Sequence, residues 1–217
     1  NALVTAPLSK TSIIESGLRD IGHTEILSRI CKTKPLFMGF MGAKFNVVLA
    51  TGHEPLRKAV QQLSVSRVSQ AFAAAEQLRS ILSSTKRDLP MALVGVNPHA
   101  GEGGLLGAEE VKLRNFLKTS KWVKTIAGPL VPDVAFLPRN WPLYSVYICT
   151  YHDQGLIPFK MIHGFQAGVH VTLGLPFVRT SVDHGTAKDL FGKNKAEPGS
   201  MVDAISTAIR LSRRKIK

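Results

Sequence analysis

Short apolar runs alternate with stretches of helical periodicity along most of the 217-residue chain. The runs that we expect to form strands cover residues 2–5, 45–51, 91–96, 144–150 and 168–173. The helices that we expect lie near residues 11–20, after Pro55, over 65–82, over 109–119 and over 200–212. This alternation predicts an α/β fold with a largely parallel sheet.

Three of the predicted strands lead into a histidine. "NVVLATGH" ends in His53, "MALVGVNPH" in His99 and "YSVYICTYH" in His152. Because parallel strands bring their carboxyl ends to one edge of a sheet, the three imidazoles are expected to converge there on a divalent cation such as zinc. A single histidine of this kind more often caps a helix or bonds a backbone carbonyl, and Asp153 beside His152 helps to favour the metal for the set.

The glycine-rich stretch "HAGEGGLLG" is not a dinucleotide-binding fingerprint. Gly101 and Gly103 supply its first two glycines, but Leu106 stands where the third is required. The backbone here is expected to pass close to a ligand or a metal.

Basic side chains suggest an anionic partner. The net charge is +13, and the cluster of Lys160, Arg179, Asp183, His184 and Lys188 suits a phosphate or a carboxylate, although Lys188 alone is typical of a solvated surface. Nucleic acid is the less favoured alternative, because the basic residues are dispersed except in the tail "RLSRRKIK" and no nucleic-acid-binding motif is present.

The composition also indicates where such a chain works. Its two cysteines cannot form a disulfide framework, which favours a reducing, cytoplasmic setting. No apolar run approaches the roughly 20 residues of a membrane span.

Longer motifs resemble the 4-hydroxythreonine-4-phosphate dehydrogenase family. They are "VNPHAGEGGLLGAEE", "YHDQGLIPFK" and "GVHVTLGLPFVRTSVDHGTAKDLFGK", extended by "VTAPLSK", "GHTE" and "ATGHEPL". The resemblance implies a three-layer α/β/α fold like that of isocitrate and isopropylmalate dehydrogenases, with a cleft between two lobes. It implies a homodimer with the active site at the interface, a divalent metal (zinc, magnesium or cobalt), and NAD or NADP. The implied reaction oxidises 4-phosphooxy-L-threonine and releases CO2, giving 3-amino-2-oxopropyl phosphate for pyridoxal phosphate biosynthesis.

The resemblance also implies roles for individual residues. The metal ligands are expected to be His53, His99 and His152, with His152 on a different chain from the other two. The expected substrate contacts are His23, Thr24, Asp133, Lys160, His170 and Arg179. Asp153 and Lys160 are the expected catalytic residues, and the expected cofactor loop is Asp183, His184, Gly185 and Thr186. His170 stands where the family commonly has asparagine, which changes the shape of the pocket there.

The implied domains are a metal-binding and dimerisation lobe over residues 1–165 and the C-terminal part of a cofactor lobe over 166–217. The family's opening segment is not found ahead of Asn1, and we expect a fragment or a degraded gene product. Two alternatives stay open: a dehydrogenase for 4-phospho-D-threonate or 4-phospho-D-erythronate, and an inactive chain that binds polyanions through its basic tail.

Overall fold

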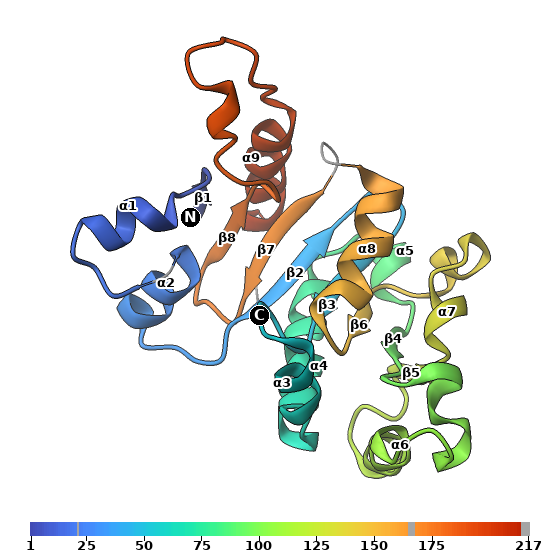
Figure 1. Ribbon diagram of the computed structural model, residues 1–217. Coiled ribbons are helices and arrows are strands. Elements are labelled where there is room, and N and C mark those ends of the chain that lie inside the picture. The colour runs from blue at the N-terminus through green and yellow to red at the C-terminus, as the bar shows by residue number, and fades with distance from the viewer. Residues whose placement is uncertain (21, 165–167, 214–217) are drawn as a thin grey trace.

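The computed structural model describes residues 1–20, 22–164 and 168–213, which form one sheet of eight strands (Figure 1). The strands lie side by side in the order β1-β8-β7-β2-β3-β6-β4-β5. Their bounds are β1 Ala2–Thr5, β2 Phe37–Met41, β3 Asn46–Leu49, β4 Met91–Val94, β5 Ile126–Leu130, β6 Tyr147–Cys149, β7 Val169–Leu173 and β8 Val178–Ser181.

Helices connect most of these strands. The α-helices are α1 Lys10–Glu15, α2 His23–Cys31, α3 Leu56–Gln61, α4 Val65–Ser80, α5 Ser84–Arg87, α6 Glu109–Thr119, α7 Pro132–Ala135, α8 His152–His163 and α9 Gly199–Ser212. Short 3-10 segments follow at η1 Pro98–Gly104, η2 Pro138–Leu143 and η3 Lys188–Leu190. All five expected strands and all five expected helices are present, and α6 has the predicted bounds.

The sheet is mixed, so the expectation of a largely parallel sheet was only partly right. β3, β6, β4 and β5 run parallel to one another, as do β1 and β8. β2 is antiparallel to both of its neighbours, β3 and β7, and β7 is antiparallel to β8. β2, β5 and β8 had not been expected as strands.

The core has two sides because neighbouring residues of a strand point to opposite faces. In β3, Val47 and Leu49 pack with α8 on one face, whereas Val48 faces α4 on the other, and α9 covers β7 and β8 on that same side. Figure 1 shows α8 on one side of the sheet and α4 and α9 on the other. This is the expected three-layer α/β/α arrangement. The expected boundary between two lobes, at residues 165 and 166, lies outside the described residues.

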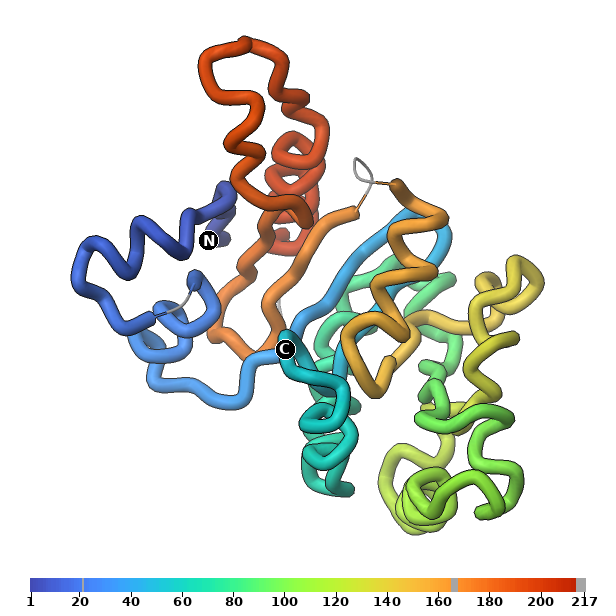
Figure 2. Tube along the Cα trace, viewed as in Figure 1, coloured from blue at the N-terminus to red at the C-terminus, as the bar shows by residue number. Residues whose placement is uncertain are grey.

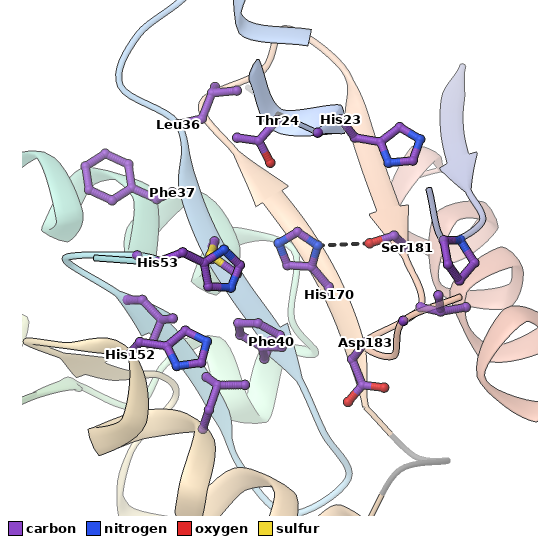
Figure 3. A pocket seen from close by; sticks show the side chains of 18 of the residues that line it. His23, Thr24, Leu36, Phe37, Phe40, His53, His152, His170, Ser181 and Asp183 are labelled. Carbon is purple, nitrogen blue, oxygen red and sulfur yellow. Dashed lines mark hydrogen bonds between the residues drawn. The ribbon is translucent and has the colours of Figure 1, made fainter. Parts of the chain in front are cut away.

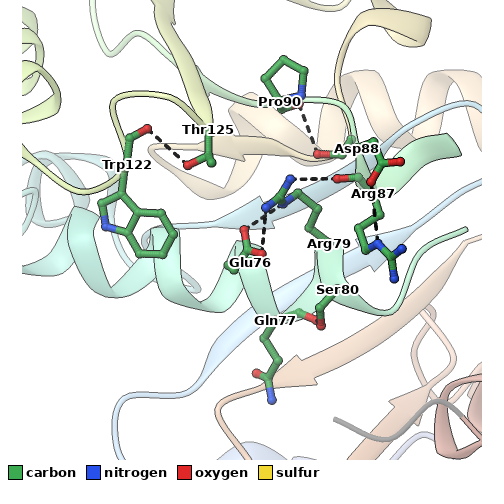
Figure 4. Close-up of polar contacts among 10 residues, drawn as sticks. Glu76, Gln77, Arg79, Ser80, Arg87, Asp88, Pro90, Trp122 and Thr125 are labelled. Carbon is green, nitrogen blue, oxygen red and sulfur yellow. Dashed lines mark hydrogen bonds and ion pairs between the residues drawn. The ribbon is translucent and has the colours of Figure 1, made fainter. Parts of the chain in front are cut away.

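Polar contacts fix the C-terminal end of α4, which covers the sheet (Figure 4). Arg79 pairs with Glu76 through two hydrogen bonds of 2.7 and 2.9 Å and donates to the backbone carbonyl of Arg87. Gln77 Oε1 accepts a hydrogen bond from the backbone N–H of Gly174, just after β7. These contacts tie α4 to α5 and to the strand that carries His170.

Segments from the two ends of the sequence lie together in the fold. Figure 2 shows residues 2–5 beside residues 178–181, which pair as β1 and β8. Within the described ranges, no helix has the length and apolar character needed to cross a membrane.

Candidate functional site

A cavity of about 570 Å³ opens beside the carboxyl ends of β3 and β6. Figure 3 shows His53 and His152 on one side of it, with His23, His170, Ser181 and Asp183 on the other. Ten of the predicted site residues line this cavity: His23, Thr24, His53, His152, Lys160, His170, Arg179, Asp183, His184 and Gly185. The fold therefore brings together most of the residues that the sequence indicated.

His53 and His152 form a close pair because β3 and β6 are parallel neighbours. Their ring centroids lie 5.0 Å apart. Burial, helped by the nearby charge of His152, lowers the pKa of His53 and keeps its imidazole in the neutral form that binds metals. Nδ1 of His152 donates a hydrogen bond of 2.7 Å to the Asp153 carboxylate, so Nε2 is the ring nitrogen that remains for a metal. Two imidazoles with these properties suit a divalent cation such as zinc.

His99 does not join this pair. Its side chain is 67% exposed and contacts Glu102 at 3.1 Å. Among the residues that the structure describes, no three histidine, cysteine or acidic side chains gather closely enough to bind a metal. The expectation that the three histidines converge within one chain was therefore wrong. Within this chain His53 and His152 lie together, and His99 is the one that stands apart.

The loop that carries His99 has an unusual backbone. Residues 99–103 all have positive φ angles, between 43° and 77°, so this turn is left-handed. Glu110 holds it from α6: the side chain is fully buried, and Oε1 accepts from the backbone N–H groups of Val96 and Asn97, each at 2.6 Å. The left-handed turn directs His99 to the surface, away from the ends of β3 and β6.

Arg179 forms the base of the opposite wall. It is 3% exposed, and its Nη1 lies 2.9 Å from Thr172 Oγ1 and 3.2 Å from Nδ1 of His170. Its Nη2 donates to Thr5 Oγ1 in β1. Burial lowers the pKa of Arg179 to about 10, so the group remains a cation at neutral pH. The guanidinium is therefore a fixed positive charge beneath the cavity.

Lys160 and Asp183 meet at the rim of this wall. Lys160 Nζ donates to the backbone carbonyl of Asp183 at 3.2 Å. The two carboxylate oxygens of Asp183 are buried and have no hydrogen-bond partner within the described ranges. Burial raises the pKa of Asp183, although the charges of Lys160 and His184 oppose that shift. The wall thus offers both a cation and an unpaired acceptor to a ligand.

Besides His99, three predicted site residues lie outside this cavity. Asp133 is exposed on α7, and Thr186 follows the cavity-lining loop without contributing to the lining. Asp153 lines a smaller cavity of about 220 Å³ behind the histidine pair and acts on His152 instead. Part of the basic tail, including Lys215 and Lys217, lies outside the described residues.

Several lining residues had not been predicted. Lys10, Glu54, Arg67 and Ser181 all border the cavity. Arg67 donates through Nε to the carbonyl of Ala50 at 2.7 Å, and its guanidinium stacks on the Phe37 ring. No sequence motif predicts its position at the cavity. Ser181 alternates with Arg179 along β8, so the two side chains lie on the same face of that strand.

Known proteins resemble this chain over nearly its whole length. Residues 1–208 match the family described as "Pyridoxal phosphate biosynthetic protein PdxA". A 4-hydroxythreonine-4-phosphate dehydrogenase of Sulfurihydrogenibium sp. is 38% identical over 98% of this chain. A D-threonate 4-phosphate dehydrogenase of Pectobacterium atrosepticum is also 38% identical over 98% of it. The crystal structure of 4-hydroxythreonine-4-phosphate dehydrogenase from Klebsiella pneumoniae superposes with a TM-score of 0.85 at 34% identity, covering 97% of this chain and 63% of that one.

The chain is shorter than these proteins. It spans 66% of the length of the Sulfurihydrogenibium protein and 65% of the Pectobacterium protein.

Proposed function

The chain belongs to the PdxA family of pyridoxal phosphate biosynthetic proteins, and on that premise we propose that it acts as an NAD(P)-dependent dehydrogenase. The proposed reaction oxidises 4-phosphooxy-L-threonine and releases CO2. The observation that carries the proposal is one cavity that holds both a close histidine pair, His53 and His152, and a buried cation, Arg179. Such a cavity suits a substrate with a hydroxyl at one end and a phosphate at the other.

Different residues are proposed to bind the two ends of the substrate. His53 and His152 would hold a divalent cation, which supplies Lewis-acid chemistry to the reacting hydroxyl and to the ketone that follows. Arg179 and Lys160 would bind the phosphate or the carboxylate through charge-assisted hydrogen bonds. Asp183 and the loop after it would hold the dinucleotide or a substrate donor group, because both Asp183 oxygens lack a partner in the described part of the chain.

A second copy of the chain is proposed to complete the site. His53 and His152 supply two ligands, and a catalytic metal site usually takes three from the protein. His99, exposed on its left-handed turn, is the proposed third ligand, supplied by the partner subunit. The chain would then work as a homodimer with two shared sites.

Activity can be tested directly on the purified chain. Formation of NADH or NADPH from 4-phosphooxy-L-threonine would be followed with Zn²⁺, Mg²⁺ or Co²⁺ present. Activity that is retained by His53→Ala would refute the assignment of the pair. No activity in the wild-type chain with any of the three metals and either cofactor would refute the proposed function for this chain.

Mixing inactive variants tests the shared site. His53→Ala and His99→Ala together should recover about a quarter of the activity, because each mixed dimer keeps one intact site and random exchange makes half of the dimers mixed. His53→Ala and His152→Ala should recover none, because their defects lie in the same half of the site. Recovery with the second pair and not with the first would reverse the assignment.

A further inference from the structure

Buried hydrogen bonds join the ends of the three strands that precede the histidines. Thr51 follows β3, Thr150 follows β6 and Gly95 follows β4, and all three residues are buried. Thr51 Oγ1 donates to the backbone carbonyl of Thr150 at 2.9 Å. Gln154, which is 9% exposed and lies in the first turn of α8, contacts both Thr150 and Gly95. The three turns that lead to the histidines therefore share one polar network.

The amide of Gln154 has the one orientation that satisfies this network. Its Oε1 accepts from the backbone N–H of Thr150 at 2.7 Å and from Oγ1 of Thr150 at 2.9 Å. Its Nε2 donates to the backbone carbonyl of Gly95. Because a backbone N–H only donates and a carbonyl only accepts, the amide oxygen must face Thr150 and the nitrogen must face Gly95. An apolar side chain at this position would leave both buried backbone groups unpaired.

The network holds the two turns that carry the histidine pair. Thr51 and Thr150 each lie two residues before a histidine, His53 and His152, whose rings are 5.0 Å apart (Figure 3). The bond from Thr51 to Thr150 links the two turns directly, and Gln154 fixes the second turn against α8. Neither turn can shift without breaking a buried hydrogen bond, so the spacing of the two imidazoles depends on these bonds.

The contact with Gly95 extends the network to the turn of His99. Val96 and Asn97 follow Gly95 directly, and Glu110 accepts hydrogen bonds from their backbone N–H groups. The same turn is therefore fixed on one side by Glu110 and on the other by the amide from α8. One buried amide thus connects the histidine pair to the turn that would present His99 to a partner subunit.

We propose that Gln154 is a positioning residue, which sets the placement of the metal-binding histidines by holding the strand ends that precede them. The inference rests on the proposed function and deepens it, because it concerns the cation of that same site. Gln154 also has the position of a helix cap, since its side chain reaches back to a backbone N–H ahead of α8. A cap alone does not explain the bond to Gly95, which belongs to another part of the sheet. Metal affinity separates the two roles, because loss of a cap lowers stability without changing the spacing of the histidines.

Gln154→Met tests this role against a matched control. Methionine has a similar length and removes all the hydrogen bonds of the amide. The control is Asn46→Leu, because Asn46 Nδ2 donates to the carbonyl of Ser145 at 3.0 Å and connects β3 to the segment before β6, at the ends of these strands that lie away from the histidines. Calorimetry with Co²⁺ on the purified chain should show a roughly 10- to 100-fold weaker affinity in Gln154→Met, the usual effect of losing a residue that orients a metal ligand. Asn46→Leu should keep the wild-type affinity for Co²⁺ even though its urea midpoint falls.

Thr51→Val gives a second and milder test. Valine keeps the shape of threonine but removes the hydrogen bond to Thr150. The Kd for Co²⁺ should therefore rise by a smaller factor than in Gln154→Met. The visible absorption of bound Co²⁺, which depends on its coordination geometry, should change in both variants and not in Asn46→Leu.

The outcomes distinguish this inference from the proposed function. An unchanged Co²⁺ affinity in Gln154→Met and Thr51→Val would overturn the positioning role and leave the proposed function intact. An equal loss of affinity in Asn46→Leu would overturn it too, because any loosening of the sheet would then have the same effect. If the wild-type chain binds no Co²⁺, the proposed metal site fails and the inference fails with it. If circular dichroism shows that Gln154→Met is not folded, Thr51→Val decides alone.

Discussion

The left-handed turn at residues 99–103 allows a stability experiment with a built-in control. Gly101 and Gly103 have nearly the same backbone, with φ of +77° and +69°. A Cβ at either position costs about 1–2 kcal/mol in the left-handed region. Their surroundings differ: a Cβ on Gly101 would lie 2.7 Å from Glu110 Oε2, whereas a Cβ on Gly103 would meet nothing within 4 Å.

The contact with Glu110 should enlarge the effect of Gly101→Ala. The carboxylate is fully buried and cannot move without weakening its bonds to the N–H groups of Val96 and Asn97. Losing one hydrogen bond to a charged group costs about 1.5–3 kcal/mol. We therefore expect Gly103→Ala to lower the free energy of unfolding by about 1–2 kcal/mol and Gly101→Ala by about 2.5–5 kcal/mol.

Urea and thermal unfolding, followed by circular dichroism at one protein concentration, measure the difference. For a chain of 150–250 residues, 1 kcal/mol shifts the melting temperature by about 2–4 °C, so the two variants should differ by roughly 3–12 °C. Equal losses in the two variants would refute the reasoning, because only the backbone strain would then matter. A larger loss in Gly103→Ala would mean that Glu110 does not hold the turn.

Three further perturbations have expected outcomes. Gly155→Ala places a Cβ 2.7 Å from Val47 Cγ1 and should destabilise the fold by about 1–3 kcal/mol, whereas Gly199→Ala, with nothing within 4 Å, should be neutral or slightly stabilising; urea midpoints decide between them. His170 is neutral when folded, since burial lowers its pKa to about 3, but it protonates near pH 6.5 when unfolded. Stability should therefore fall by up to about 1.4 kcal/mol per pH unit as the pH drops from 6.5 toward 3, and urea unfolding of His170→Asn at several pH values should show a shallower slope. Arg179→Ala should lower kcat/KM by roughly 10- to 150-fold on a phosphorylated substrate, and an equal loss on the dephosphorylated compound would assign Arg179 to the fold instead.

Sequence patterns predicted the elements whose periodicity was undisturbed. The helix over 109–119 has the expected bounds, and the strand around Val47 was correctly placed. The segment 152–163 is not among the expected helices, because Gly155 and Pro158 interrupt its helical pattern. The structure gives the reason for the glycine: α8 packs so closely on β3 and β6 that a side chain there would touch Val47 and Cys149. The helix α8 therefore forms because of its packing against the sheet, and not because its residues have a high intrinsic helix propensity.

The candidate site was predictable where residues follow strands and unpredictable where the chain turns. His53 and His152 meet because β3 and β6 are parallel neighbours, as their position after the two strands predicts. His99 follows β4 in the same way, but the left-handed turn places its side chain away from the pair. The pattern of apolar residues in a strand does not predict the direction of the turn that follows it. Arg67 reaches the cavity from a helix whose hydrophobic pattern gives no sign of a ligand.

The pairing of β1 with β8 also sets the order in which the molecule can be completed during folding. Thr5 and Arg179, which bond across this pairing, are 174 positions apart in the chain. Contacts of such long range close late, because the loop between them must be ordered first. During synthesis, β1 leaves the ribosome before β8 and can pair with it only after β8 has emerged. We therefore expect His53 and His152 to come together before Arg179 reaches its final position beside Thr5. A nascent chain should acquire its affinity for anions last.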